Sequence, residues 1–169
     1  MARLIPKISV DEISLKPERD VARILIDNLP QDCIVYHSYP WLKAERNDYH
    51  KGVTLKEGEA DFVIVDPQYG ILILEVKGGE VEYDAPYHKW YRILNNGDKR
   101  EIKNPFEQAS KNTHFLKNQI LSCSFPGQSS LPCAFGYAVV FPDCKYSGSV
   151  PPGADNAIVL SAEDLPILH

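Results

Sequence analysis

Two carboxylates and a lysine lie among apolar residues in the segment GEADFVIVDPQYGILILEVKGG, residues 58–79. Asp61 precedes the first apolar run, and Glu75 and Lys77 lie at the end of the second. Strands covered on both faces seldom carry carboxylates, because an unpaired charge is costly to remove from water. Two acids beside an ammonium group are suited to binding a divalent cation and a phosphate. The segment therefore predicts metal-assisted phosphate chemistry.

The spacing of these residues predicts that their side chains meet. The turn-forming residues DPQYG separate the two apolar runs and indicate an antiparallel hairpin with strands over 60–65 and 71–76. In the register that this turn favours, Asp61 faces Glu75, and Lys77 projects to the same side because strand residues alternate. Facing residues have Cβ atoms about 4.5–5.5 Å apart. Two carboxylates at that distance need a cation between them, and we expect Mg²⁺ or Mn²⁺.

A purely structural interpretation of the same residues is the alternative. Glu75 and Lys77 would then be exposed residues at a strand end that pair with each other or with Glu59. A Glu-x-Lys sequence alone is not specific for any function. The upstream Asp61, the apolar run before Glu75 and the two glycines after Lys77 favour the functional interpretation.

Two helices are predicted on either side of this hairpin in the sequence. The first begins at Pro17, since proline suits a first helical turn, and ends at Pro30. Glu18 projects along its apolar face at the N-terminal end. The second begins at Asn104, a good N-cap residue, with Pro105 in the first turn.

Further strands are predicted where β-branched and aromatic residues gather. The first of these strands begins at Cys33 and is expected to stop at Pro40. The polar, aperiodic stretch 43–57 is predicted as a loop. The remaining predicted strands cover 80–83, 89–94, 133–141 and 157–160.

The order of these elements predicts one domain. Residues 1–16 show no periodicity and are predicted as an irregular N-terminal segment, followed by a single domain over 17–169. Residues Ser161-Ala162-Glu163-Asp164 predict the capped start of a third helix shortly before the sequence stops. Because a helix that has barely begun makes a poor terminus, we expect the chain to be the N-terminal part of a longer protein.

The charge distribution bears on a nucleic-acid partner. The net charge of −5 argues against one. Residues 88–117 nevertheless hold seven Lys or Arg against three Asp or Glu, and a local basic stretch can bind phosphate in an acidic chain. We predict nucleic-acid contacts for Lys99, Arg100, Lys103 and Lys111. A solvated surface without a ligand is the alternative.

Composition argues against a membrane or secreted protein. No apolar stretch nears the roughly 18–20 residues of a membrane helix, and the N-terminus lacks the apolar core of a signal peptide. The four cysteines have no CxxC spacing, which favours free thiols over a zinc or redox site. We expect a cytoplasmic protein without a membrane partner.

The motifs taken together resemble the PD-(D/E)xK nuclease superfamily, and more narrowly its nuclease-related domain, NERD. The resemblance covers about 17–121. One departure is that related domains often begin the first helix with Gly-Glu, where this chain has Pro17-Glu18. The residues that carry the resemblance are Glu18, Gly58-Glu59-Ala60-Asp61, Ile73-Leu74-Glu75-Val76-Lys77-Gly78, Trp90 and Asn104-Pro105-Phe106-Glu107-Gln108-Ala109.

The resemblance implies an α/β fold, with a restriction-endonuclease-like mixed central sheet flanked by helices and a metal site at one end of the central strands. Asp61 and Glu75 would bind Mg²⁺ or Mn²⁺, and Lys77 would position or activate the attacking water. Glu18 would add a ligand or a water contact. Gln108 would lie near the site from the second helix, or else be a solvated helix residue.

The implied function is metal-dependent hydrolysis of DNA phosphodiester bonds, in DNA processing or repair. Similar domains occur alone or fused to DNA helicase, kinase or other modules, so a C-terminal helicase module is an expected partner. The alternative is a non-catalytic nucleic-acid-binding or docking domain with the same fold. Trp90 also has two interpretations, as a core residue or as a platform for base stacking.

Overall fold

The structure is a computed structural model that describes residues 1–47 and 52–165. A six-stranded mixed sheet forms its centre, in the order β1-β2-β3-β4-β8-β9. Strand β3 pairs antiparallel with both β2 and β4, whereas β1 pairs with β2, and β8 with β4 and β9, in parallel. The strands are β1 (Arg3–Ile5), β2 (Ile34–Asn47), β3 (Gly52–Asp66), β4 (Gly70–Val76), β8 (Phe135–Phe141) and β9 (Val159–Ser161).

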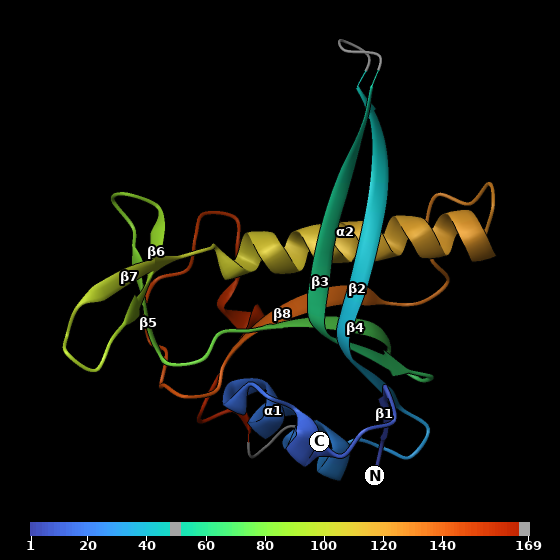
Figure 1. Ribbon diagram of the computed structural model, residues 1–169. Coiled ribbons are helices and arrows are strands. Elements are labelled where there is room, and N and C mark those ends of the chain that lie inside the picture. The colour runs from blue at the N-terminus through green and yellow to red at the C-terminus, as the bar shows by residue number, and fades with distance from the viewer. Residues whose placement is uncertain (48–51, 166–169) are drawn as a thin grey trace.

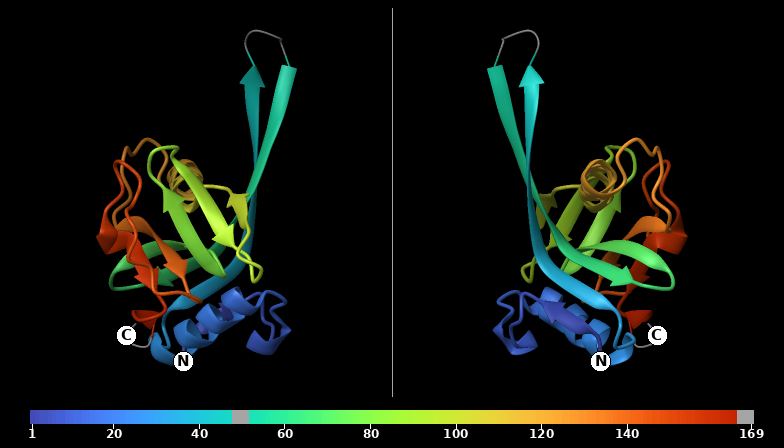
Figure 2. Two further views of the ribbon diagram at one scale, coloured as in Figure 1. Left: turned by 90° about the vertical axis from the view of Figure 1, so that its left-hand side faces the viewer. Right: turned by 90° about the vertical axis from the view of Figure 1, so that its right-hand side faces the viewer.

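Two helices cover opposite sides of this sheet, α1 (Lys16–Asn28) and α2 (Pro105–Ser124) (Figures 1 and 2). Both begin where the sequence predicts. Proline occupies the first turn of each helix, and the Asn104 side chain accepts hydrogen bonds from the backbone N–H groups of Phe106 and Glu107. The predicted fold class, an α/β restriction-endonuclease-like fold with a mixed central sheet, is therefore confirmed.

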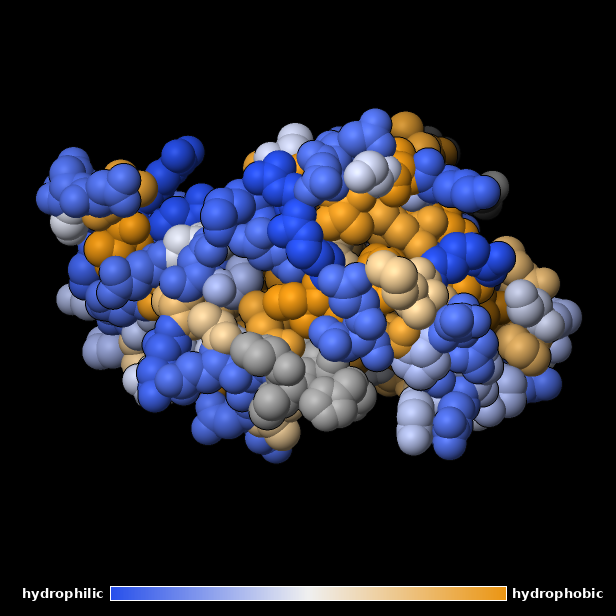
Figure 3. All heavy atoms as spheres, turned by 90° about the horizontal axis from the view of Figure 1, so that it is seen from below, coloured by the Kyte–Doolittle hydropathy of each residue, from blue (hydrophilic) through white to orange (hydrophobic). Residues whose placement is uncertain are grey.

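The apolar faces of the helices explain why they dock on the two sides. Val21, Ala22 and Leu25 of α1 are buried in one core cluster together with Phe62 and Leu74 of the sheet. Beside this cluster an apolar hollow of about 510 Å³ opens between α1 and the strands, and apolar side chains gather on this face in Figure 3. On the other side of the sheet, α2 buries Phe106, Ala109 and Leu116 against the strands.

A separate three-stranded antiparallel sheet is inserted between β4 and α2. Its strands are β5 (Glu80–Asp84), β6 (Lys89–Ile93) and β7 (Lys99–Ile102), and it lies beside the N-terminal end of α2 (Figure 1). Trp90 of β6 is only 1% exposed and packs on Phe106 and Phe141. The core interpretation of Trp90 is therefore confirmed.

A long two-stranded arm, formed by residues 40–47 and 52–59, is the largest departure from the sequence-based prediction. The stretch 43–57 was expected to be a loop, but β2 and β3 stay paired up to Asn47 and Gly52 and stand clear of the body (Figure 2). Pro40 does not end β2. Beyond Tyr36 that strand has a neighbour on one side only, and proline is tolerated on such an edge. Residues 48–51 lie outside the described residues.

A buried asparagine of α2 anchors the base of this arm. The side chain of Asn112 accepts a hydrogen bond of 2.8 Å from Nε1 of Trp41 and donates one of 2.8 Å to the carbonyl oxygen of Glu59. The Trp41 ring also stacks on Phe115, with 4.3 Å between centroids. Strand β2 is thus tied to α2 through contacts that no local sequence pattern indicates.

The chain termini depart from prediction in smaller ways. Residues 1–16 were expected to be irregular, but they contain β1 and a short 3-10 helix, Val10–Glu12. Backbone pairing with β2 stabilises β1, and a three-residue strand leaves no periodic pattern in the sequence. A second 3-10 helix, Asn156–Ile158, precedes β9. Ser161, predicted to begin a helix, ends β9, and residues 162–164 form a turn. In the described part of the chain, no helix is long and apolar enough to cross a membrane.

Candidate active site

The buried carboxylate of Glu75 is the centre of the site. Its side chain is 1% exposed at the end of β4, and Nζ of Lys77 lies 2.5 Å from its Oε1. The other oxygen, Oε2, is buried without a hydrogen-bond partner in the described structure. Burial raises the pKa of Glu75, and the Lys77 ammonium opposes that rise. A buried oxygen without a partner is costly, so Glu75 lowers stability unless another group reaches its Oε2.

Asp61 lies beside this carboxylate. The observed pairing of β3 with β4, from Val65 opposite Ile71 to Phe62 opposite Leu74, confirms the predicted register. Asp61 follows at the end of this ladder, where its Oδ2 accepts a 2.6 Å hydrogen bond from the backbone N–H of Val76. Burial, and then the charge of Glu75, raise the pKa of Asp61 to about 7, although the Val76 hydrogen bond and Lys77 act in the opposite direction. The two acids therefore interact electrostatically, as the hairpin predicted.

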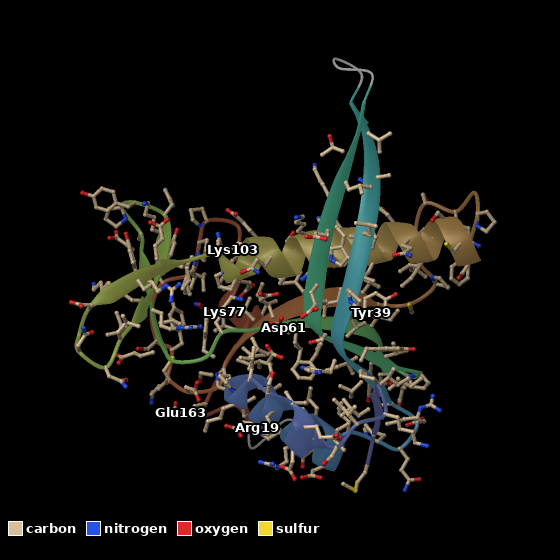
Figure 4. All side chains as sticks on the ribbon, in the orientation of Figure 1. Arg19, Tyr39, Asp61, Lys77, Lys103 and Glu163 are labelled. Carbon is tan, nitrogen blue, oxygen red and sulfur yellow. The ribbon has the colours of Figure 1, made fainter. Side chains whose placement is uncertain are left out.

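The arm leaves the sheet at this same point. The pairs of β2 with β3 include His37 with Phe62 and Tyr39 with Ala60, but the intervening Ser38 and Asp61 are not paired. Ser38 has a φ of 50°, in the left-handed region that residues other than glycine seldom adopt. Figure 4 shows Asp61 and Tyr39 at the foot of the arm. The positive φ of Ser38 and the missing pair interrupt the β2–β3 ladder at Asp61, beside Glu75.

Helix α1 brings Glu18 to the site. Its Oε2 lies 2.8 Å from Nε2 of His37, and both side chains are largely buried. The charge of Glu18 contributes to the raised pKa of both Asp61 and Glu75, which places it among the acids. No metal-ligand spacing in the sequence points to His37. Only the fold brings β2 next to the start of α1.

A close contact fixes the distance between α1 and the strand end. A Cβ atom added to Gly78 would lie 2.1 Å from Cγ of Pro17, so only glycine fits there. The Pro17-Glu18 sequence, which departs from the usual Gly-Glu, therefore has a packing role. Pro17 rests on the backbone directly after Lys77 and holds Glu18 beside Asp61.

These residues line a cavity of about 410 Å³. Glu18, Asp61 and Lys77 contribute to its wall, together with Gly79 and with Arg92 from β6 of the small sheet. Arg92 is a second residue that sequence reasoning missed as a member of the site. In the sequence, Arg92 stands out only as one charge of the basic stretch 88–117. It is too far along the chain from the hairpin for any spacing to indicate that it lines the same cavity.

The other predicted site residues are spread over a wider area. Lys103 at the start of α2 is close enough to Glu75 to lower its pKa (Figure 4). Lys99 forms a 2.6 Å ion pair with Glu82, and Arg100 is an exposed residue of β7. Nζ of Lys111 lies 5.1 Å from the centre of a Trp41 ring, at the base of the arm.

Gln108 lies in the first two turns of α2. Its Oε1 is buried and has no hydrogen-bond partner in the described residues. The residue as a whole is partly buried, so part of it still faces solvent. Its participation in the site stays a prediction.

The donor set of the site fits a hard divalent cation. Asp61 and Glu75 offer carboxylate oxygens, and Oε2 of Glu75 is already desolvated without a partner. Within the described residues, no group of three or more His, Cys, Asp or Glu side chains is arranged to hold a metal by itself. Most of the shell would then come from water and phosphate oxygens, which is how proteins commonly bind Mg²⁺.

A mixed sheet flanked by helices, with two acids and a lysine meeting at the end of its central strands, defines the class of restriction-endonuclease-like proteins. Comparison with family models identifies the family more narrowly. The nuclease-related domain, NERD, matches residues 14–142, and the chain belongs to this family. A comparison with curated proteins gave no match.

Proposed function

We propose that the protein is a metal-dependent nuclease that hydrolyses phosphodiester bonds of DNA, in DNA processing or repair in the cytoplasm. The observation that carries the proposal is the state of Glu75. One of its oxygens is bound by Lys77, the other is buried without a partner, and Asp61 lies beside it. A structural ion pair would satisfy both oxygens. An acid held in this way, in a chain of the nuclease-related family, fits a phosphodiesterase site best.

Each side chain has a distinct part in this proposal. Asp61 and Glu75 would hold Mg²⁺ or Mn²⁺, which when bound supplies charge for the scissile phosphate and acidifies a coordinated water. Lys77 would hold a phosphate oxygen or orient the attacking water with its ammonium group. Glu18, bonded to His37, would contact a water from the α1 side. Glu18, Asp61 and Lys77 line the cavity of about 410 Å³, which would receive the nucleic-acid backbone.

Cleavage assays with matched ion-pair variants test the proposal. Single- and double-stranded DNA are incubated with the protein and Mg²⁺ or Mn²⁺, with and without EDTA. We expect metal-dependent cleavage that falls by at least about 100-fold in Glu75→Gln and in Lys77→Met. The matched control is the surface pair of Lys145 and Glu163, 2.8 Å apart and outside the residues that line the cavity, changed to Lys145→Met and Glu163→Gln. Cleavage that persists in EDTA, or falls equally in both sets, would rule the proposal out.

A second candidate function is binding of nucleic acid without cleavage. A groove of about 730 Å³ runs between the arm and α2, outside the cavity of the acids. Trp41, Lys43, Lys56 and Lys111 line it, a combination of an aromatic ring and cations that suits a nucleic-acid strand. Salt-dependent DNA binding that Lys111→Gln weakens, in a protein that cleaves nothing with either metal, would favour this function.

A further inference from the structure

Arg92 is the one residue of the small sheet that lines the cavity of the acids. It is the last but one residue of β6, where its register partners are Val81 on β5 and Arg100 on β7. The rest of the wall comes from β3, from the end of β4 and the residues 77–79 that follow it, and from the start of α1 with the preceding Leu15. The small sheet thus contributes a guanidinium group to a site that otherwise belongs to the central strands.

The Arg92 side chain is held in place across the backbone that follows Lys77. A Cβ atom added to Gly79 would lie 3.4 Å from Cδ and 3.5 Å from Cγ of Arg92, so the arginine stem packs directly on this glycine. Gly79 has a φ of 82°, a conformation that other residues rarely adopt, and its N–H donates to Asp143 at 2.8 Å. The aliphatic part of Arg92 is therefore fixed two residues away from Lys77.

The polar end of Arg92 has no hydrogen-bond partner among the described residues. Its Nε is buried without a hydrogen bond, and no carboxylate of the described residues forms an ion pair with it. Arg19 and Arg23, in contrast, donate to the carbonyl oxygen of Ile13 and to Asp11. A buried guanidinium N–H without an acceptor is costly, so the geometry is suited to an acceptor that comes from a ligand.

The chemistry of the cavity limits what that acceptor can be. The cations that hold down the pKa of Glu75 are Lys77 and Lys103, so the acids already have cationic partners of their own. Guanidinium groups bind phosphate oxygens through a planar pair of N–H groups. A phosphate that approaches Asp61 and Lys77 therefore meets Arg92 in the wall of the same cavity.

We propose that Arg92 binds a non-bridging oxygen of a nucleic-acid backbone phosphate next to the scissile bond. The small sheet is then a substrate-binding element. The inference rests on the proposed function for the identity of the ligand. It goes further in assigning a phosphate contact to Arg92, a residue outside the motifs that carry the family resemblance.

DNA binding with calcium in place of magnesium tests the inference separately from cleavage. Fluorescence anisotropy with a labelled single-stranded and a labelled duplex oligonucleotide gives Kd over a series of salt concentrations. In Arg92→Gln we expect Kd to rise about tenfold and the slope of log Kd against log salt to fall by about one, since each phosphate contact contributes about 0.9. Isothermal titration with Mn²⁺ should give the same affinity as the unaltered protein.

Two further variants make the result specific. Arg3→Gln removes the same charge from β1, away from the small sheet (Figure 1), and should leave Kd and slope unchanged. Arg92→Lys keeps the charge but loses the planar donor pair, so the slope should be kept while Kd rises severalfold. This variant carries the test alone if Arg92→Gln lowers the melting temperature.

The outcomes separate the two proposals. If DNA binding depends on Arg92 but the protein cleaves no DNA, the proposed nuclease function is wrong and the proposed phosphate contact is supported. If Arg92→Gln and Arg92→Lys cleave DNA with an unchanged KM and an unchanged salt slope, the nuclease function is supported and the phosphate contact of Arg92 is wrong. Mn²⁺ affinity that falls together with DNA affinity would also overturn it, because Arg92 would then act only on the acids.

Discussion

Two lysine–glutamate pairs in this protein join the same groups at almost the same distance in opposite surroundings. Lys77 and Glu75 lie 2.5 Å apart at the end of the central sheet, with 16% and 1% of their side chains exposed. Lys99 and Glu82 lie 2.6 Å apart on the small sheet, with 50% and 47% exposed. About half of the surface pair remains exposed to water, whereas Oε2 of Glu75 is buried and no group of the described residues replaces the water it has lost.

This difference shows that a short distance between two charged groups does not determine how much the pair contributes to stability; the exposure of the two side chains does. Solvated pairs contribute about 0–1 kcal/mol, because water competes for both charges. A buried pair carries a desolvation penalty that can exceed its attraction, and removal of one partner leaves a buried charge. The central sheet therefore retains Glu75 at a cost to stability, which is typical of residues kept for function.

The largest expected effect is on stability when the buried pair is broken. Lys77→Met should lower the free energy of unfolding by about 3–5 kcal/mol, because Glu75 is left buried and unpaired. Urea denaturation in EDTA measures it, with Lys99→Met as the matched control. Equal losses in the two variants would mean that the buried pair is as well solvated as the surface pair.

A bound cation should offset part of the desolvation penalty of the Glu75 carboxylate. Mn²⁺ at about 100 times its Kd is expected to stabilise the protein by about 2.7 kcal/mol, because it binds only the folded state. Thermal unfolding with and without Mn²⁺ measures the shift. Asp61→Asn should abolish it, whereas Asp98→Asn, an exposed turn residue, should not. A shift that survives in Asp61→Asn would place the metal elsewhere.

The pH dependence of the metal-free protein sharpens the comparison further. The pKa of Asp61 rises from 3.8 to about 7 on folding, so the folded state holds this proton more tightly than the unfolded chain. Its contribution to stability is complete below about pH 4 and is lost as the pH rises through about 7. Urea unfolding in EDTA from pH 5 to 8 should show this decline. The same decline in Asp61→Asn would assign it to another group.

The smallest effect is expected at the surface pair. A double-mutant cycle with Glu82→Gln and Lys99→Met should give a coupling energy of about 0.2–1 kcal/mol that fades with added salt. The equivalent cycle at Glu75 and Lys77 should exceed it severalfold. A strong coupling on the small sheet would show that exposure alone does not separate the two pairs.

Local patterns sufficed for much of the fold and for the centre of the site. The turn after Val65 determined the register of the hairpin, and the structure brings Asp61, Glu75 and Lys77 together as that register predicts. Proline and asparagine at the helix starts were equally informative, because a cap is decided by neighbours in sequence.

What could not be predicted depends on contacts between distant segments. The arm has no apolar alternation of its own, and its base is held by Asn112 of α2, more than fifty residues from Glu59. His37 and Arg92 reach the site because β2 and the small sheet pack beside it. No spacing rule connects these residues to the hairpin, so tertiary structure alone identifies them.

The contact between Gly78 and Pro17 has a consequence for how mutational scans of this protein should be interpreted. Position 78 supplies no side chain to any reaction, yet even a methyl group there must push α1 outward and carry Glu18 with it. A scan scored by activity would rank this glycine with the acids themselves. Measuring abundance and turnover side by side for Gly78→Ala would reveal it as a spacer whose role is to keep two secondary-structure elements in contact.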